Sequence, residues 1–253
     1  TAPMVNTSHA IRSAKMLRMA ALELDMEEDV AVYEDDIRIL TAALAPAWDD
    51  EAGYFGYVCH DADGQPKEIL RHESGANFNM GLDGASPLVA GACTPEQRAR
   101  LLSHLETEGV LWCPIGLSTV DQSAPYFTND GYWNGAVWMP HQWFMWKACL
   151  DAGRADLAWR IAKTGLDLWK NEVEASYNCF EHFIVQTGRG AGWHHFGGLS
   201  TPVLQWYNAY YQPGRLTTGF DVWIRDLNVS EDASSLCAEL RLTGNADEVC
   251  SAV

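Results

Sequence analysis

One carboxylate stands among aromatic side chains and histidines in the segment 178–211. Glu181 lies between Phe180 and His182, and a glycine-rich turn, GRGAGW, follows it. Sugars bind on aromatic rings, and glycosidic bonds are hydrolysed by pairs of carboxylates. The pattern therefore predicts one side of a carbohydrate-processing site, in which Glu181 is one member of the pair.

A glutamate among aromatic side chains has its charged form disfavoured unless it is hydrogen-bonded or paired. A general base must stay ionised, so we expect His182, Arg189 or a bound water to support Glu181. The residues leave a second interpretation open, in which Glu181 is a loop glutamate paired with Arg189 or with the histidines and has no catalytic part.

Upstream lies a second aromatic block, GYWNGAVWMPHQWFMW. Trp143 and Trp146 fall within an apolar helical segment, so we expect them to pack in the core. Trp133 and Trp138 precede Pro140, at the expected entry to that helix, where pockets commonly open. These two indoles are candidates either for stacking on a sugar ring or for the core.

Other site chemistries lack their sequence patterns. The histidines at 141, 182, 194 and 195 show neither helical i, i+4 spacing nor HExxH, so we expect no metal site. The GRGAGW turn has no phosphate-binding lysine after it and does not join a strand to a helix, which excludes a nucleotide loop. A GxSxG elbow and a cysteine nucleophile signature are absent too.

The elements that must position these residues are mostly helices. Apolar spacing predicts helices over 5–24, with its face at Ile11, Ala14, Leu17, Ala21 and Leu24, and over 30–44. The turn at 61–64 predicts a β-hairpin, and Thr94 begins a helix with proline early in its first turn. Three more helices follow.

The first of these, from Pro140 to Gly153, is apolar on nearly all sides. The second, over 156–169, is amphipathic, with Leu157, Ile161, Gly165 and Leu168 on one stripe, and Ser200-Thr201-Pro202 caps the third. Alternation of an all-round apolar helix with a one-sided helix indicates an inner and an outer layer. We therefore predict a mainly α fold, a toroid of helical hairpins over 1–213.

The pattern of apolar and polar residues changes after Pro213-Gly214. Short alternating segments, FDVWI, LCAELRL and EVCSAV, are separated by turn-forming residues and predict the start of a β element over 214–253.

The composition of the chain narrows the classes of molecule that it could bind. The chain has 34 acidic and 17 basic residues, a formal charge of −17, which disfavours nucleic acid and anionic membrane surfaces as partners. No apolar run approaches the ~20 residues that span a bilayer, and the N-terminus lacks the apolar core of a signal peptide. The seven cysteines are scattered singly, as expected of reduced thiols. These features favour a cytoplasmic protein.

At its two aromatic blocks the chain resembles the (α/α)6-barrel glycoside hydrolases of family 63 and their relatives, which include the glucosylglycerate and mannosylglycerate hydrolases. Residues 132–138, YWNGAVW, look like the family's YWRGxxW segment. The base-bearing motif is matched by FEHF at 180–183, GRG at 188–190 and FGGLS at 196–200. PIGLS at 114–118 lies where the family has PxGLxS.

The resemblance covers roughly residues 4–211. It implies an (α/α)6 toroid, an inverting mechanism with Glu181 as the general base, and a terminal α-linked glucose or mannose as substrate. It implies neither a metal ion nor an organic cofactor. We expect the substrate to be bound by Tyr132, Trp133, Asn134, Trp138, His141, Gln142, His182, Arg189, Trp193, His194 and His195.

Two departures from the family pattern affect function. Asn134 stands where the family often has arginine, and loss of that cation disfavours an anionic substrate. The family's general acid is an aspartate in a segment that would lie ahead of Thr1, so we expect the chain to lack an N-terminal part, which would be its partner. Asp83 is the one in-chain candidate, and we interpret it as part of a loop before a helix.

Two other classes of function stay open on the residues alone. A non-catalytic carbohydrate-binding or scaffold domain would keep the aromatic side chains without the acid. A sugar epimerase or isomerase on a similar toroid would use His141, His194 or His195 for proton transfer.

Overall fold

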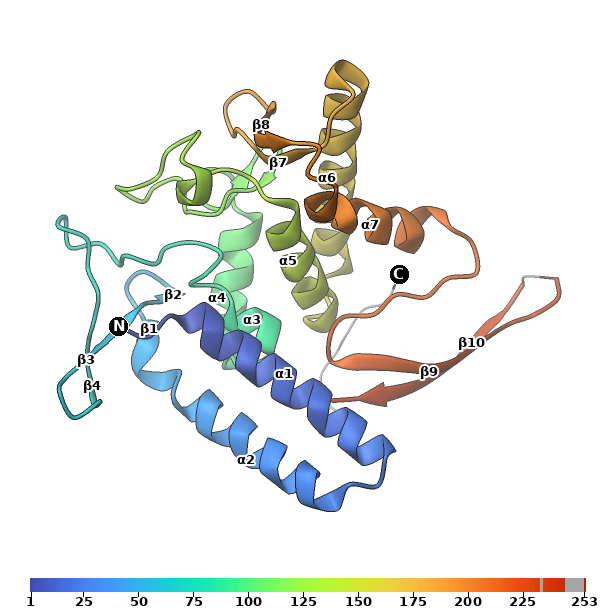
Figure 1. Cartoon of the computed structure of the whole chain (residues 1–253), viewed down its shortest axis with the longest axis horizontal. Coiled ribbons are helices and arrows are strands. Elements are labelled where there is room, and N and C mark those ends of the chain that lie inside the picture. The colour runs from blue at the N-terminus through green and yellow to red at the C-terminus, as the bar shows by residue number, and fades with distance from the viewer. Residues whose placement is uncertain (233, 244–252) are drawn as a thin grey trace. The chain divides into compact units, whose positions relative to one another are not determined.

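The computed structural model describes residues 1–232, 234–243 and 253 (Figure 1). The chain forms two compact units. The first comprises Thr1–Leu111 with Val120–Phe127, and the second comprises Trp112–Thr119 with Thr128–Val253. The described residues contain seven α-helices, and their ten short strands pair as five two-stranded antiparallel ladders.

The first unit begins with a helical hairpin, α1 (Met4–Glu23) and α2 (Glu27–Ala42), whose helices lie side by side in Figure 1. Both predicted helices are confirmed. The predicted apolar face of α1 is only partly right, because Leu17 and Leu24 are exposed. In their place α1 buries polar residues that bond to neighbouring segments, with Ser8 near Ser86 at 3.1 Å.

Polar side chains thus form part of the α1 interface. The Nε of Arg12 donates to the backbone oxygen of Val89 at 2.8 Å, which ties α1 to the short helix α3 (Pro87–Ala90). Hydropathy cannot predict such a contact, since it assigns arginine to the surface.

The remaining predictions for this unit are confirmed. A hairpin of β3 (Val58–His60) and β4 (Pro66–Ile69) turns at 61–64, where the Asp61 carboxylate accepts two backbone N–H bonds. Helix α4 (Pro95–Glu106) begins with a capping box, in which the Thr94 hydroxyl accepts from the Gln97 N–H at 3.2 Å. Asp83 lies in the turn before α3, and its carboxylate accepts a 3.4 Å hydrogen bond from Tyr57.

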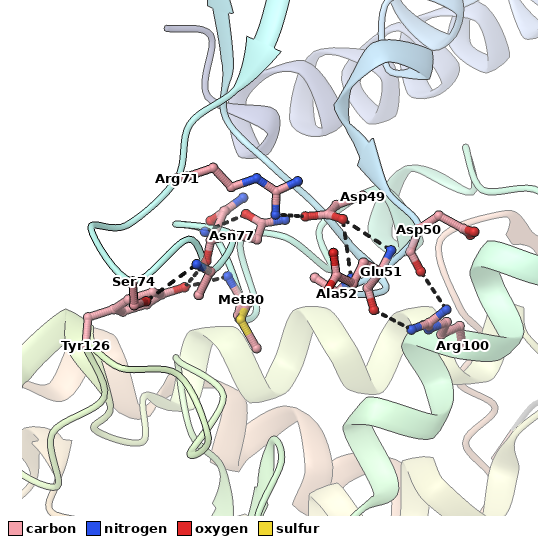
Figure 2. A network of polar contacts seen from close by, with 12 residues as sticks. Asp49, Asp50, Glu51, Ala52, Arg71, Ser74, Asn77, Met80, Arg100 and Tyr126 are labelled. Carbon is pink, nitrogen blue, oxygen red and sulfur yellow. Dashed lines mark hydrogen bonds and ion pairs between the residues drawn. The ribbon is translucent and has the colours of Figure 1, made fainter.

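A polar network fixes the turn between β1 (Trp48–Asp49) and β2 (Tyr54–Phe55) (Figure 2). The buried Asp49 carboxylate accepts from Arg71 at 2.6 Å and from the N–H groups of Glu51 and Ala52 at 3.2 and 3.3 Å. Arg100 of α4 donates to two backbone oxygens of the same turn, each at 2.8 Å.

The second unit opens with the small ladder of β5 (Trp112–Cys113) and β6 (Gly116–Leu117) and a 3-10 turn, η2 (Tyr132–Asn134). Helices α5 (Met139–Asp151) and α6 (Ala155–Ser176) confirm the two predicted helices, and they pack together. Helix α6 runs beyond the predicted end at 169.

Helix α7 (Thr201–Tyr211) crosses α6 closely. The buried Trp206 indole lies over Gly165, where a Cβ would come within 2.6 Å of its ring. The predicted serine cap of α7 is wrong. The Ser200 hydroxyl instead accepts from the Trp169 indole at 2.9 Å, and Thr201 donates to the Gly198 oxygen at 2.7 Å.

Two further ladders complete this unit. One joins β7 (Phe180–Phe183) to β8 (Gly190–His194), and the other joins β9 (Val222–Val229) to β10 (Leu236–Leu242). The second ladder confirms two of the three predicted C-terminal β segments; the third, at 248–253, lies outside the described residues apart from Val253.

Two observations concern the described residues as a whole. All six of their cysteines are free thiols, while Cys250 lies outside the described part of the chain. Among the same residues, no helix has both the length and the apolar composition that a membrane span requires.

We predict that Asp49→Ala lowers the free energy of unfolding by about 2–3 kcal/mol, because the substitution leaves Arg71 and two turn N–H groups without their charged acceptor. Chemical denaturation monitored by circular dichroism measures the change. Asp63→Ala, in the exposed hairpin turn, serves as the matched control and should change stability by less than about 0.5 kcal/mol. Equal effects of the two substitutions would contradict the role of the network.

We also predict that the sign of the effect of Gly165→Ala depends on Trp206. In the wild-type background the new methyl group presses on a buried ring, and the net loss is about 1–2 kcal/mol after the better helix propensity of alanine is included. In a Trp206→Phe background the clashing ring atoms are gone, so the same substitution should stabilise by up to about 1 kcal/mol. Thermal denaturation of the four proteins tests this, and the same sign in both backgrounds would refute close packing.

Candidate active site

The two aromatic blocks of the sequence come together through the backbone. Val137, just before α5, and Phe183, at the end of β7, exchange two N–H···O bonds, each of 2.9 Å. A third bond runs from the N–H of Val185 to the oxygen of Asn129 at 3.2 Å. These bonds place the segment 129–138 directly beside the strand that carries Glu181.

The Glu181 carboxylate is held at both oxygens. The Tyr132 hydroxyl donates to Oε1 at 2.6 Å, and the Trp193 backbone N–H donates to Oε2 at 3.1 Å. Both donors favour the charged form, and they lower the pKa of Glu181 below its ordinary value, the Tyr132 bond being the larger cause. Tyr132 has a φ of +56°, in the left-handed region that side chains rarely adopt.

A β-bulge in β8 aims the Trp193 N–H at the carboxylate. Phe180 pairs with His194 and His182 pairs with Ala191, so β8 contains one more residue than β7 between the two pairs. Gly192 takes up the extra length with a φ of +73°. A Cβ at Gly192 would lie 2.6 Å from Glu181 Oε2, so only glycine leaves the carboxylate its space.

The tryptophans beside Glu181 divide into a buried ring and an exposed one. Trp133 and Trp138 stack with their centroids 3.8 Å apart and their planes within 10°. Trp138 is 2% exposed, and its indole donates to the Tyr132 backbone oxygen at 3.2 Å, whereas Trp133 is 48% exposed. Trp138 is therefore core support, and Trp133 presents the open aromatic surface. Trp146 is fully buried, as predicted.

The structure contradicts the expectation that Gln142 binds the substrate. Its amide is buried and bonds both ways to Leu117, the Nε2 donating to the oxygen and the Oε1 accepting from the N–H, each at 2.8 Å. Because both ends of the amide are occupied by the β6 backbone, Gln142 is a structural residue and does not face a ligand.

Arg189 pairs with a different carboxylate from the one that we expected. Its guanidinium donates to the buried Glu172 at 2.8 and 3.0 Å, and the Gly190 N–H adds a third bond at 2.9 Å. These bonds, led by that from Arg189, lower the pKa of Glu172 to about 2. Arg189 thereby anchors the turn before β8 to α6 and does not pair with Glu181.

The other residues that we expected to bind the substrate are His141, Asn134, Trp193, His194 and His195. His141 lies near the Trp133 ring at 5.3 Å, and Asn134 is exposed in η2. The exposed Trp193 stacks on His194 at 5.6 Å. His195 is also exposed and adopts a φ of +59°. No group of three or more histidine, cysteine or acidic side chains suited to a metal ion occurs among the described residues.

Sequence reasoning missed two contributors. Glu172 lies four residues beyond Leu168 on the apolar stripe of α6, and a charged residue on a buried stripe was the available signal. The Trp193 N–H had no such signal, because a backbone donor carries no residue identity.

An apolar hollow of about 610 Å³ lies elsewhere in this unit, between α6 and α7. Its walls include Trp169, Val203, Leu204 and Tyr207. None of the predicted site residues lines it, so the candidate site is the surface around Glu181.

Comparison with known proteins places the chain in a family. Residues 2–197 match the domain family described as "Mannosylglycerate hydrolase MGH1-like glycoside hydrolase domain". A mannosylglycerate hydrolase of Thermus thermophilus is 30% identical over 190 residues, which are 74% of this chain and 41% of that protein.

Solved structures give the same relationship. The GH63 mannosylglycerate hydrolase from another strain of Thermus thermophilus, in complex with glucose, matches with a TM-score of 0.66 and 25% identity, over 81% of this chain and 47% of that one. The same enzyme with Tris and D-glycerate matches with a TM-score of 0.66 and 26% identity, over 81% and 45%.

The chain thus spans less than half the length of these relatives. Within that span, the family match covers the aromatic block at 131–146 and the segment 178–211 as far as residue 197. The chain belongs to the mannosylglycerate hydrolase MGH1-like family of glycoside hydrolase domains.

Proposed function

We propose that the protein is an inverting glycoside hydrolase that cleaves a terminal α-linked mannose or glucose, with Glu181 as the general base. The observation that carries the proposal is the carboxylate held by Tyr132 and Trp193 beside an exposed tryptophan face. Glu181 takes a proton from a water, and that water attacks the anomeric carbon while the bond to the leaving oxygen breaks.

The electrostatics suit a base. Glu181 is kept ionised by a phenol and a backbone amide, which are neutral donors. A carboxylate paired with arginine, as Glu172 is, holds its charge too firmly to accept a proton near neutral pH. The two glutamates therefore have different parts, one catalytic and one structural.

The proposal extends to the fold and to the second carboxylate. Residues 1–213 form part of an (α/α)6 toroid, and residues 214–253 begin a separate β element. A complete toroid needs more helices than the seven that the described residues contain. We assign the general acid to an aspartate other than Asp83, since Asp83 is a turn residue bonded to Tyr57.

The substrate class follows from the relatives and from one difference. The relatives are mannosylglycerate hydrolases, and one of their structures holds D-glycerate. In this chain Asn134 replaces the family's cation and Arg189 is paired with Glu172, so neither supplies a free positive charge for a carboxylate. We propose an uncharged α-glycoside as the preferred substrate.

We predict that Glu181→Gln lowers kcat by about 10²–10⁴-fold, because the amide keeps the side-chain shape but cannot take a proton. The assay uses the full-length gene product with aryl α-mannosides, aryl α-glucosides and mannosylglycerate. Proton NMR of the first product should show the β-anomer, as inversion requires. Glu174→Gln, an exposed glutamate on α6, is the control and should retain wild-type activity.

Three results would contradict the proposal. Release of the α-anomer would show retention, and full activity of Glu181→Gln would remove the base. Return of an intact sugar carrying solvent deuterium on carbon would indicate an epimerase instead.

We predict that Tyr132→Phe raises the pKa of Glu181 toward its ordinary value, because the largest stabiliser of the charged form is lost. Carbon-13 NMR of the glutamate carboxyl measures the pKa directly, and the resonance is assigned by its absence in Glu181→Gln. We expect kcat to fall about 10- to 100-fold, as a loosened catalytic group loses its alignment. An unchanged pKa would mean that the phenol does not hold the carboxylate.

A further inference from the structure

His182 is buried next to the proposed base and has an unused nitrogen. Its side chain belongs to a residue that is only 4% exposed, and its Nδ1 has no hydrogen-bond partner among the described residues. A buried nitrogen without a partner costs free energy, so such atoms commonly mark the place of a water or a ligand.

The free nitrogen and the proposed base both lie beside Gly192. The position that a Cβ would take on Gly192 lies 2.6 Å from Glu181 Oε2 and 2.9 Å from His182 Nδ1. Oε2 and Nδ1 are therefore close enough to each other for one water to bridge them with hydrogen bonds of about 2.8 Å. A side chain at position 192 would collide with both atoms, and glycine avoids that collision.

The ring of His182 cannot readily turn away from this space. It stacks on Trp138 with centroids 5.1 Å apart and planes within 19°, and it meets the Tyr132 ring edge-on at 5.2 Å. Its Nε2 lies 3.8 Å from a carboxylate oxygen of Asp130, which favours a proton on that nitrogen. Nδ1 then carries the lone pair and accepts hydrogen bonds.

We propose that His182 Nδ1 accepts one hydrogen of the water that Glu181 deprotonates, so that both side chains together aim the nucleophile. This inference rests on the proposed function. One water proton passes to Glu181 Oε2, and the electron pair of that O–H bond stays on the oxygen as it bonds to the anomeric carbon. The glycosidic electron pair leaves with the departing oxygen, which takes the proton of the general acid, and the second hydrogen stays on the new hydroxyl and donates a hydrogen bond to Nδ1.

Such a role requires a neutral imidazole. Burial lowers the pKa of His182 below its ordinary value and outweighs the negative charges of Glu181 and Asp130, which act to raise it. The other groups that face the ring are the Tyr132 phenol and the Trp138 indole. At neutral pH the ring is therefore uncharged. On acidification Nδ1 gains a proton and can no longer accept from the water.

The experiment uses an α-mannosyl or α-glucosyl fluoride, because fluoride leaves without a proton and the general acid is not needed. In the full-length protein we expect His182→Ala to lose about 10- to 100-fold in kcat with little change in KM. His182→Asn, whose amide oxygen can replace Nδ1 as an acceptor, should recover most of that loss. His60→Asn, on the exposed end of β3, is the matched control.

The pH profile separates this role from a purely structural one. In the wild type the acidic limb of kcat/KM follows protonation of His182, below its ordinary pKa of 6.5. In His182→Asn the limb should move to lower pH, where Glu181 becomes protonated. If the acidic limb of kcat/KM lies at the same pH in His182→Asn as in the wild type, the proposal is overturned.

A further measurement does not depend on the folding of variants. Nitrogen-15 NMR of the wild-type histidines at pH 7 should show His182 with its proton on Nε2, and a proton on Nδ1 would overturn the inference. Full activity of His182→Ala would do the same. By contrast, a wild type that leaves the fluoride intact, or a fully active Glu181→Gln, would defeat the proposed function itself.

Discussion

The candidate site depends on one backbone pairing, the two hydrogen bonds between Val137 and Phe183. This pairing fixes the aromatic segment against β7, and the contacts of Tyr132 and Trp138 with β7 cross it. The Tyr132 hydroxyl contacts Glu181, and the Trp138 ring stacks on His182, because the two segments are paired in that register.

Glu172 and Glu181 differ in the donors that hold them. Glu172 is buried and accepts hydrogen bonds from the Arg189 guanidinium and the Gly190 amide, and the guanidinium balances its charge. It holds the start of β8, and β8 in turn carries the amide that holds Glu181. Glu172 thus orders the strand that supplies one of the two donors to the proposed base.

Two glycines of β8 are required where they stand because a side chain there would collide with β7. Gly190 packs under the Phe180 ring, where a Cβ would come within 2.1 Å, and Gly192 forms the bulge beside the carboxylate. Both positions require the absence of a side chain more than flexibility. The bulge also places Gly192 beside both Glu181 and His182, which are neighbours in one strand.

Much of this protein follows from its sequence alone. The helices over α1, α5 and α6, the capping box at Thr94 and the aromatic and glutamate motifs are local patterns, so periodicity and residue type suffice to predict them. The choice of Glu181 as the catalytic candidate came from the same local context and from family resemblance.

Only the tertiary structure decided the partners of these residues. It assigned Arg189 to Glu172, turned Gln142 into a support for β6, and separated the exposed Trp133 from the buried Trp138. It also supplied a backbone N–H and an unpaired imidazole nitrogen as elements of the site. Such contacts join residues far apart in the chain or use atoms common to all residues, and for that reason no pattern along the sequence records them.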